Sequence, residues 1–458
     1  MQLEHRIIHL DLKGAPWKVP YLEKVLLRAK AWGATGVLFE WEDTFPYTDE
    51  LVTLGSITGC GGDGMYTMDE VQHMMQFCKE NGLEVVQLVQ TIGHLEFVLK
   101  HPAFTHLREL PESATSLCPS KPQSLALVCS MLDQVLDAQP NANYLHIGAD
   151  EVWHTGVCPD CKKRMEGSVH GVASLYLEHI QKLALFLKMK RPNLTILMWD
   201  DMLRSMSLDA LEFYKLGELV QPVLWDYNVS QHFHIRPRLM EIYRVLFPKV
   251  WAASAFKGAS GDTKAIAPVS RYVSNHVAWM NEVQMYPDIK FAGIILTGWS
   301  RYDHFKTLCE LLPVSLPSLA SCLRTVTKVD DRPMESLVSD WLPAPEWPGA
   351  ALARGARRAA ALALRSHHFV IEQTNEDLDL HPTNSNDSLK NTDNTTELLK
   401  ELYAVKDEVT NLLSEITGKR STEEWVQFNI MPSIKMLTEI ENRSLNISLP
   451  TTEDSNQL

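Results

Sequence analysis

The first 312 residues alternate between short apolar runs and longer amphipathic stretches, and this alternation limits the folds that the chain can adopt. The apolar runs occupy residues 7–12, 36–41, 83–89, 144–147, 194–199, 222–227, 250–254 and 293–299. Their length favours buried strands, and the amphipathic stretches between most of them favour helices. Strands that alternate with helices form a parallel sheet. Eight such units predict an α/β fold in which residues 1–312 form a closed (β/α)8 TIM barrel.

The pattern changes after residue 312. Residues 313–373 form a helical segment rich in Pro, Ala and Arg, and the polar residues 374–396 are typical of an exposed linker. Apolar residues at helical spacing then predict C-terminal helices over residues 397–444, followed by a flexible tail at 445–458. We therefore expect a barrel followed by a helical C-terminal region, which could support a homodimer.

The charge balance argues against two classes of partner. A count of 43 Lys and Arg against 57 Asp and Glu gives a formal net charge of −14, and no basic run suits nucleic acid or anionic lipid. The first residues lack the basic start and apolar stretch of a signal peptide, and no apolar run is long enough to span a bilayer. We therefore expect a cytoplasmic or nuclear protein with no nucleic-acid or membrane partner.

Acidic, histidine and aromatic side chains recur where the predicted strands end. They are Glu40, Glu42, His94, Asp150, Glu151, Trp199, Asp200, Trp225, Tyr227 and Trp299. Taken singly, a Trp at such a position is more often part of the core, and an Asp more often caps a helix. In a (β/α)8 barrel, however, the carboxyl ends of all strands meet at the face that carries the active site. The recurrence therefore predicts a single pocket.

The adjacent acids Asp150 and Glu151 follow the fourth apolar run. Most retaining glycosidases hold two carboxyl groups about 5 Å apart across the scissile bond. Neighbouring residues of a strand point to opposite faces, so this pair suits that scheme only if the strand end bends. A mechanism in which the two acids have different roles fits better: Glu151 protonates the leaving oxygen, and Asp150 orients a nucleophile that the substrate supplies. The carbonyl oxygen of a 2-acetamido sugar is such a nucleophile.

The segment from His146 to Val152, His-Ile-Gly-Ala-Asp-Glu-Val, closely resembles the His-x-Gly-Gly-Asp-Glu signature of glycoside hydrolase family 20, the β-N-acetylhexosaminidases. The resemblance covers the barrel and implies that Glu151 is the general acid/base and Asp150 the residue that orients the acetamido group. Ile92-Gly-His94 resembles the family's Pro-Gly-His turn, whose histidine supports the acid through a hydrogen-bonded relay. Ala149 replaces the second Gly of the signature.

The resemblance also implies substrate contacts and an activity. Trp199, Trp225 and Trp299 stand where the family's pocket tryptophans are expected, and Tyr227 is the candidate hydroxyl for the acetamido oxygen. The implied activity is that of an exo-acting retaining β-N-acetylhexosaminidase that removes terminal GalNAc or GlcNAc from glycoconjugates by substrate assistance. The expected partner is therefore an amino-sugar glycan.

Glu42 and Asp200 complete the expected substrate-binding set, and the segment that begins with Glu42 resembles the family's acidic-Ser-Phe-Pro segment, which backs the histidine. The sequence departs from the family at two places. Asp11 and Lys13 stand at the end of the first strand, where many members carry Arg, and Trp299-Ser-Arg-Tyr-Asp303 replaces the common Trp-x-Glu. Both places concern the ring hydroxyls, so the choice between galacto and gluco substrates stays open.

Two other classes of function remain as alternatives. A catalytically inactive sugar-binding barrel is one, although the intact acid and orienting carboxylate argue against it. A metal-dependent hydrolase with His94, His146 and the two adjacent acids as ligands is the other, but His146 lies inside its strand and fits the core better. Cys158-Pro-Asp-Cys161 would need a second ligand pair to hold zinc, and the cysteine spacing indicates none. We therefore expect no metal and no cofactor.

Overall fold

The computed structural model describes residues 3–55, 64–327, 347–378 and 385–447. It divides into two compact units. The first comprises Met1–Pro348 with Ile416–Ser421, and the second comprises Gly349–Glu415 with Thr422–Leu458. Each unit has its own set of elements and is described by itself.

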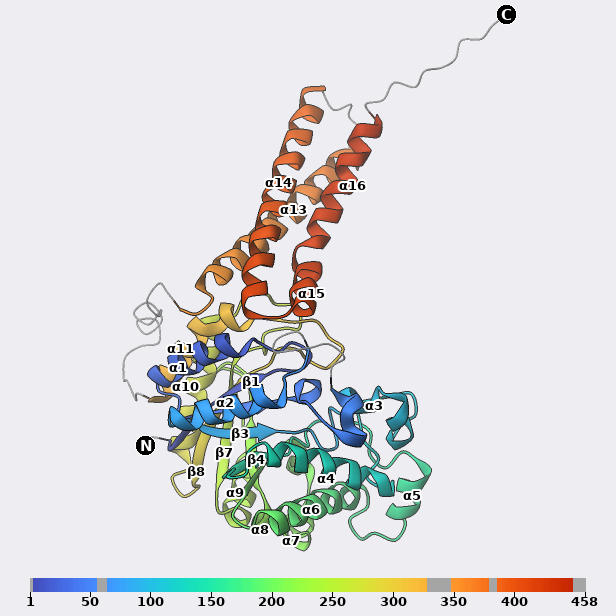
Figure 1. Cartoon of the computed structure of the whole chain (residues 1–458), viewed down its shortest axis with the longest axis vertical. Coiled ribbons are helices and arrows are strands. Elements are labelled where there is room, and N and C mark those ends of the chain that lie inside the picture. The colour runs from blue at the N-terminus through green and yellow to red at the C-terminus, as the bar shows by residue number, and fades with distance from the viewer. Residues whose placement is uncertain (1–2, 56–63, 328–346, 379–384, 448–458) are drawn as a thin grey trace, which may run out of the picture. The chain divides into compact units, whose positions relative to one another are not determined.

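Parallel strands in the first unit close into a barrel in chain order (Figure 1). The strands are β1 (His5–Asp11), β2 (Gly36–Glu40), β3 (Glu84–Leu88), β4 (Tyr144–His146), β5 (Thr195–Trp199), β6 (Gln221–Trp225), β7 (Val250–Lys257) and β8 (Phe291–Gly298). Pairing of β1 with β8, from His5 opposite Gly293 to Ile8 opposite Leu296, completes the closure. Each predicted apolar run overlaps one of these strands, so the predicted (β/α)8 TIM barrel is confirmed.

Helices surround the barrel strands in Figure 1. They are α1 (Val19–Ala31), α2 (Met68–Glu80), α3 (Glu96–Leu99), α4 (Pro122–Asp137), α5 (Pro159–Met165), α6 (Val172–Lys190), α7 (Leu208–Phe213), α8 (Leu216–Leu219), α9 (Pro237–Leu246), α10 (Val269–Met285) and α11 (Leu312–Thr327). Short 3-10 turns, η1 (Glu42–Thr44), η2 (Asp49–Leu54), η3 (Pro102–Leu107) and η4 (Asp201–Ser205), lie in the connections. None of the described helices combines the length and apolar character that crossing a bilayer requires.

The barrel interior changes from apolar to polar along its axis. Ile7, Leu38 and Leu197 belong to the apolar core cluster. Two residues further along the first two of those strands, on the same face, stand the buried His9 and Glu40, whose Nε2 and Oε2 atoms are 2.9 Å apart. Buried polar groups are tolerated when they are hydrogen-bonded, so this layer forms a paired network. Glu40 of this layer lies 4.0 Å from the ammonium of Lys13, which lines a pocket at the carboxyl ends of the strands.

The second unit is helical. Its helices are α13 (Ala350–Leu378), α14 (Ser385–Ile416), α15 (Lys419–Asn429) and α16 (Met431–Ile447). Ion pairs join α13 to α14 through Arg358 with Glu408 and Arg365 with Glu401, and α16 packs along α13. The predicted helical C-terminal region is therefore confirmed. Helices α15 and α16 are separate because Pro432, in the first turn of α16, lacks the N–H that a continuous helix needs.

Three predicted boundaries differ from the structure. The barrel was expected to end at 312, but α11 starts there and packs on α10 and β7 inside the first unit. Helices α13 and α14 extend into the expected linker 374–396. Residues 328–346 and most of the expected tail 445–458 lie outside the described residues.

The turns that follow β3 and β4 touch through their backbones. A Cβ added to Gly93 would lie 2.1 Å from the carbonyl oxygen of Asp150, so only glycine permits this approach. Gly148 has φ of +61°, and a Cβ there would lie 2.0 Å from the side-chain oxygen of Gln90. The non-glycine residues His94, Ala149 and Glu151 also have positive φ, at 50°, 71° and 46°. The chain therefore bends sharply at both strand ends.

We expect Gly93→Ala to lower the free energy of unfolding by about 1–3 kcal/mol, because the added methyl group must push two fixed backbone turns apart. Urea and thermal unfolding measure the change. Gly167→Ala is the matched control, since a Cβ there meets nothing within 4 Å, and it should change stability by less than about 0.5 kcal/mol. Equal stabilities of the two variants would contradict the proposed contact.

Candidate active site

A pocket of about 330 Å³ lies at the carboxyl ends of the barrel strands. Among its lining residues are seven of the nine predicted site residues, namely His94, Asp150, Glu151, Trp199, Trp225, Tyr227 and Trp299. The fold therefore gathers them as the strand-end pattern predicts. Glu42 and Asp200, also predicted as substrate contacts, are not among the lining residues.

The sharp bend after β4 lets both acids reach the same histidine. Nε2 of His94 lies 3.5 Å from Oδ2 of Asp150 and 3.3 Å from Oε2 of Glu151. Adjacent residues of a regular strand could not both do this, so the positive φ values at Ala149 and Glu151 are essential. The predicted condition, that the strand end must bend, is met.

Side-chain hydrogen bonds hold the bend on all sides. The amide oxygen of Gln90 accepts the Ala149 N–H at 3.2 Å, and the Tyr176 hydroxyl donates to the Ala149 carbonyl at 2.7 Å. Asp201 accepts the Glu151 N–H at 2.9 Å. Because strained φ values persist only where the surroundings fix them, these bonds are part of the site.

The site is strongly coupled electrostatically. Burial disfavours the charged form of His94, but the adjacent Asp150 and Glu151 outweigh this effect and raise its pKa to about 10. Burial raises the pKa of Asp150 to about 6, against the lowering effect of His94. His94 is therefore a cation at neutral pH, and Asp150 titrates just below neutrality.

Several polar atoms in this region are positioned for a ligand. Oδ1 of Asp150 is buried and has no hydrogen-bond partner within the described residues, whereas buried polar atoms are normally paired. Nε1 of Trp199 is in the same state. Burial raises the pKa of Tyr227, so its hydroxyl stays protonated and can donate. The pocket residues thus offer one acceptor, the Asp150 carboxylate oxygen, and two donors, the Trp199 indole N–H and the Tyr227 hydroxyl.

Aromatic rings form the walls. Trp225 and Tyr227 stack with ring centroids 5.3 Å apart, and Trp199 lies 5.9 Å from Trp299. Tyr227 meets Trp299 edge to face at 6.5 Å, so the four rings are continuous. Such walls can cover the apolar face of a sugar and a methyl group while they exclude water.

Lys13 is a pocket residue that the sequence flagged only as a departure from the family. Its ammonium lies 3.5 Å from Asp11, 3.8 Å from Glu42 and 4.0 Å from Glu40, and 5.2 Å from the centre of the Trp299 ring. Burial opposes its charge, but these carboxylates outweigh burial and raise its pKa well above the ordinary value. A buried, fixed cation therefore forms part of the pocket wall.

The structure corrects the expectations for Asp200 and Glu42. Trp199 faces the barrel interior, so the next residue, Asp200, faces the surrounding helices, where it pairs with Arg204 at 2.9 Å and with the Tyr243 hydroxyl at 3.3 Å. Glu42 does not line the pocket, and its carboxylate contacts Lys13 and accepts from His304 at 2.9 Å rather than from His94.

The acid that sequence reasoning missed is Asp201. Besides accepting the Glu151 N–H, it accepts from Nε1 of Trp225 at 3.3 Å, so it joins the acid to the aromatic wall. Burial, with the nearby Asp150, raises its pKa to about 7. The Asp200-Asp201 pair was visible in the sequence, but the direction of each side chain was not.

Solved structures with this fold include several hexosaminidases. A β-N-acetylhexosaminidase from Bacteroides fragilis aligns with a TM-score of 0.54 at 18% identity, covering 72% of this chain and 67% of that one. The Streptomyces plicatus N-acetyl-β-hexosaminidase in complex with Thio-NAglucal aligns with a TM-score of 0.52 at 14% identity, covering 73% and 66% of the two chains. At these identities the likeness concerns the fold alone.

Proteins found by sequence comparison are more similar to this chain than those solved structures are. Residues 41–232 match the catalytic domain of glycosyl hydrolase family 20. Hexosaminidase D of Homo sapiens is 45% identical over 324 residues, which cover 70% of this chain and 65% of that protein. Hexosaminidase D of Bos taurus is 43% identical over 326 residues, which cover 71% of this chain and 92% of that protein. With its barrel and pocket, the chain thus belongs to glycosyl hydrolase family 20.

Proposed function

We propose that the protein is an exo-acting β-N-acetylhexosaminidase that removes terminal GalNAc or GlcNAc from glycoconjugates with retention of configuration. The single observation that carries this proposal is the buried, unpaired Oδ1 of Asp150 in the pocket beside the more exposed Glu151. The pocket, at about 330 Å³, is near the lower end of ligand-site sizes, which suits one terminal sugar.

In the first proposed step, Glu151 gives its proton to the glycosidic oxygen as the bond to the anomeric carbon breaks. The carbonyl oxygen of the substrate's acetamido group attacks that carbon and forms a cyclic oxazolinium intermediate. Asp150 accepts the acetamido N–H through Oδ1 and stabilises the positive charge that develops. The leaving alcohol departs with the proton from Glu151.

In the second step, the Glu151 carboxylate accepts a proton from water, and the water oxygen attacks the anomeric carbon. The acetamido group is regenerated, Glu151 is again protonated, and two inversions give net retention. The His94 cation, within 3.5 Å of both acids, offsets the negative charge that Glu151 acquires between the steps. His94 therefore acts by holding and balancing the pair.

The remaining wall residues support recognition of the sugar. Trp199, Trp225 and Trp299 can enclose the acetamido methyl group, and the Tyr227 hydroxyl can donate to the acetamido oxygen. Lys13 lies at the pocket wall where many relatives of this family carry Arg, so we assign it to the ring hydroxyls. These roles together fix the acetamido group near the anomeric carbon.

The deciding experiment compares chromogenic β-GalNAc, β-GlcNAc and β-galactoside as substrates. We expect turnover of the two acetamido sugars only. Glu151→Gln should lower kcat by about 10²–10⁴-fold, because general acid catalysis is lost. Asp150→Asn should lower it by about 10²–10³-fold, because the charge that stabilises the intermediate is lost.

Glu166→Gln and Asp288→Asn are matched controls, since both side chains are exposed, and both should keep wild-type activity. Equal turnover of the β-galactoside would refute substrate assistance. No turnover of any sugar by correctly folded wild type would overturn the enzyme proposal and favour an inactive sugar-binding barrel.

We expect kcat/KM to fall as the pH falls through about 6, because burial raises the pKa of Asp150 to about 6 and only its ionised form can accept the acetamido N–H. A pH profile on a substrate whose leaving group does not titrate in this range measures the effect. An acid limb at the ordinary aspartate value of 3.8 would contradict the assignment.

The same pKa predicts a stability effect of the opposite sign to the activity effect. The folded-state pKa of about 6 lies above the ordinary 3.8, so ionised Asp150 destabilises the fold above pH 6 and has no such effect below 3.8. Asp150→Asn should therefore stabilise the protein near neutral pH by up to about 3 kcal/mol, and the gain should vanish in acid. Melting temperatures across this range test it, and a variant less stable than wild type at neutral pH would contradict it.

A further inference from the structure

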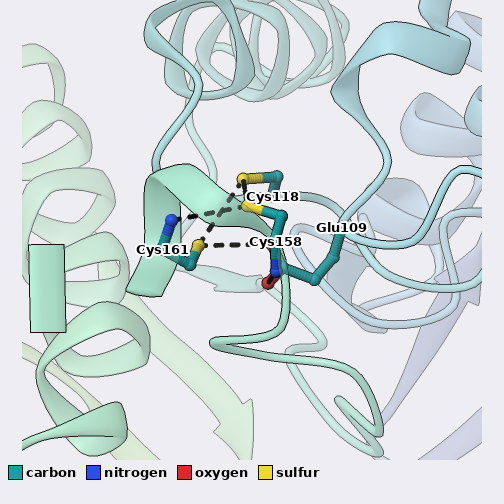
Figure 2. A group of neighbouring side chains, drawn as sticks. All are labelled: Glu109, Cys118, Cys158 and Cys161. Carbon is teal, nitrogen blue, oxygen red and sulfur yellow. Dashed lines mark hydrogen bonds between the residues drawn. The ribbon is translucent and has the colours of Figure 1, made fainter. Parts of the chain in front are cut away.

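Four side chains from two connections of the barrel converge on one point (Figure 2). Glu109 and Cys118 belong to the connection between β3 and α4, and Cys158 and Cys161 stand at the start of α5. An antiparallel bridge between Arg108 and Leu117 places Glu109 and Cys118 together. The sequence-based expectation that Cys158 and Cys161 lack a second ligand pair is thus corrected, because the fold supplies one cysteine and one glutamate.

The spacing of the ligand atoms suits a single ion. Sγ of Cys118 lies 3.4 Å from Sγ of Cys158 and 3.6 Å from Sγ of Cys161, and Cys161 Sγ lies 3.2 Å from Oε2 of Glu109. All four ligand atoms lie within 4.8 Å of one another. A tetrahedral zinc with Zn–S of about 2.3 Å needs S···S edges of about 3.8 Å, so the ligands need to move only a few tenths of an ångström.

Hydrogen bonds already hold the carboxylate of Glu109 in an orientation that suits a metal ligand. Its Oε1 accepts the backbone N–H groups of Val157 and Cys158 at 2.6 and 2.9 Å, which leaves Oε2 directed at the sulfurs. The residue is 1% exposed, and no Lys, Arg or His forms an ion pair with it in the part of the chain that the structure describes. Burying a carboxylate without a basic side chain beside it costs free energy, and a bound metal cation would offset that cost.

The donor set favours zinc. Three thiolates and one carboxylate fill a tetrahedron, and soft sulfur ligands select zinc over magnesium or calcium. Cys158 Sγ also accepts the backbone N–H of Cys161 at 3.4 Å, as suits a thiolate. The Arg164 guanidinium, which also pairs with Glu178 at 2.6 Å, donates at 3.2 Å to Ser120, whose hydroxyl lies 3.0 Å from Cys161 Sγ.

We propose that Glu109, Cys118, Cys158 and Cys161 bind one structural Zn²⁺ ion that clamps the loops bearing the active-site residues. On one side, the Leu117 N–H donates to the Ile92 carbonyl at 2.9 Å, two residues before His94. On the other side, Cys158 lies seven residues after Glu151. Because all four positions are taken by protein, the ion holds no water and performs no chemistry. Binding releases the thiol protons.

The test begins with the metal content of the full chain, purified under reducing conditions without chelator and measured by mass spectrometry. We expect about one zinc per chain. Cys118→Ser should lose most of it, and Glu109→Gln should bind zinc at least about tenfold more weakly. Cys129→Ser, which changes a cysteine outside the cluster, should keep it.

Cobalt substitution gives a spectroscopic test that does not depend on a variant's folding. Wild-type protein loaded with Co²⁺ should show a strong thiolate-to-cobalt charge-transfer band in the near ultraviolet and tetrahedral bands in the visible region. Hydrogen exchange of residues 115–118, beyond the contact at Gly93, should be faster in Cys118→Ser than in Cys129→Ser.

Two outcomes would overturn the proposal. One is wild-type protein that stays free of metal after incubation with zinc while its thiols are reduced. The other is unchanged metal content in Cys118→Ser. Neither readout uses glycosidase activity, so failure of the metal site and failure of the proposed function are distinguishable.

Discussion

The active site depends on the backbone contact between the turns that follow β3 and β4. Gly93 lies so close to the Asp150 carbonyl that no other residue fits, and this approach brings one imidazole to both acids. Left-handed φ values at His94, Ala149 and Glu151 cost on the order of 1 kcal/mol each. The barrel maintains these φ values because each strand end is hydrogen-bonded to both neighbouring strands. The backbone at the strand ends therefore cannot relax to a less strained conformation by a local movement.

Charge is arranged in two groups at the pocket, each centred on one cation. In the first group Lys13 is surrounded by carboxylates, and in the second His94 lies between Asp150 and Glu151. In each group the acids outnumber the cation, and the aromatic walls keep the effective dielectric low. The pocket is therefore poised to stabilise positive charge, which is what develops at the anomeric carbon and acetamido group in the proposed reaction. Burial of Asp150, together with the negative charges of Glu40 and Glu151, outweighs the effect of His94 and raises the pKa of Asp150 to about 6.

The sequence predicted the barrel and most of the pocket because parallel strands deliver their carboxyl ends to one face whatever their loops do. It could not separate Asp200 from Asp201, since a one-residue difference at the end of β5 decides which acid turns toward Glu151. It also could not find Glu109 and Cys118. Those residues meet Cys158 and Cys161 through loop paths that no periodicity encodes, and the loop glutamate carries no motif of its own.

The loops beyond the strand ends lack the barrel's continuous ladder, yet a displacement of about 1 Å at the acids would be costly to the proposed reaction. The backbone contact at Gly93 fixes the near end of both loops by sterics alone. A zinc at the cysteine cluster would fix their far ends, through Leu117 on one side and α5 on the other. Since the two attachments lie at opposite ends of the same loops, loss of the ion would leave His94 beside the acids. It would instead loosen the segments beyond them, and so act on loop order more than on the pKa values of the site.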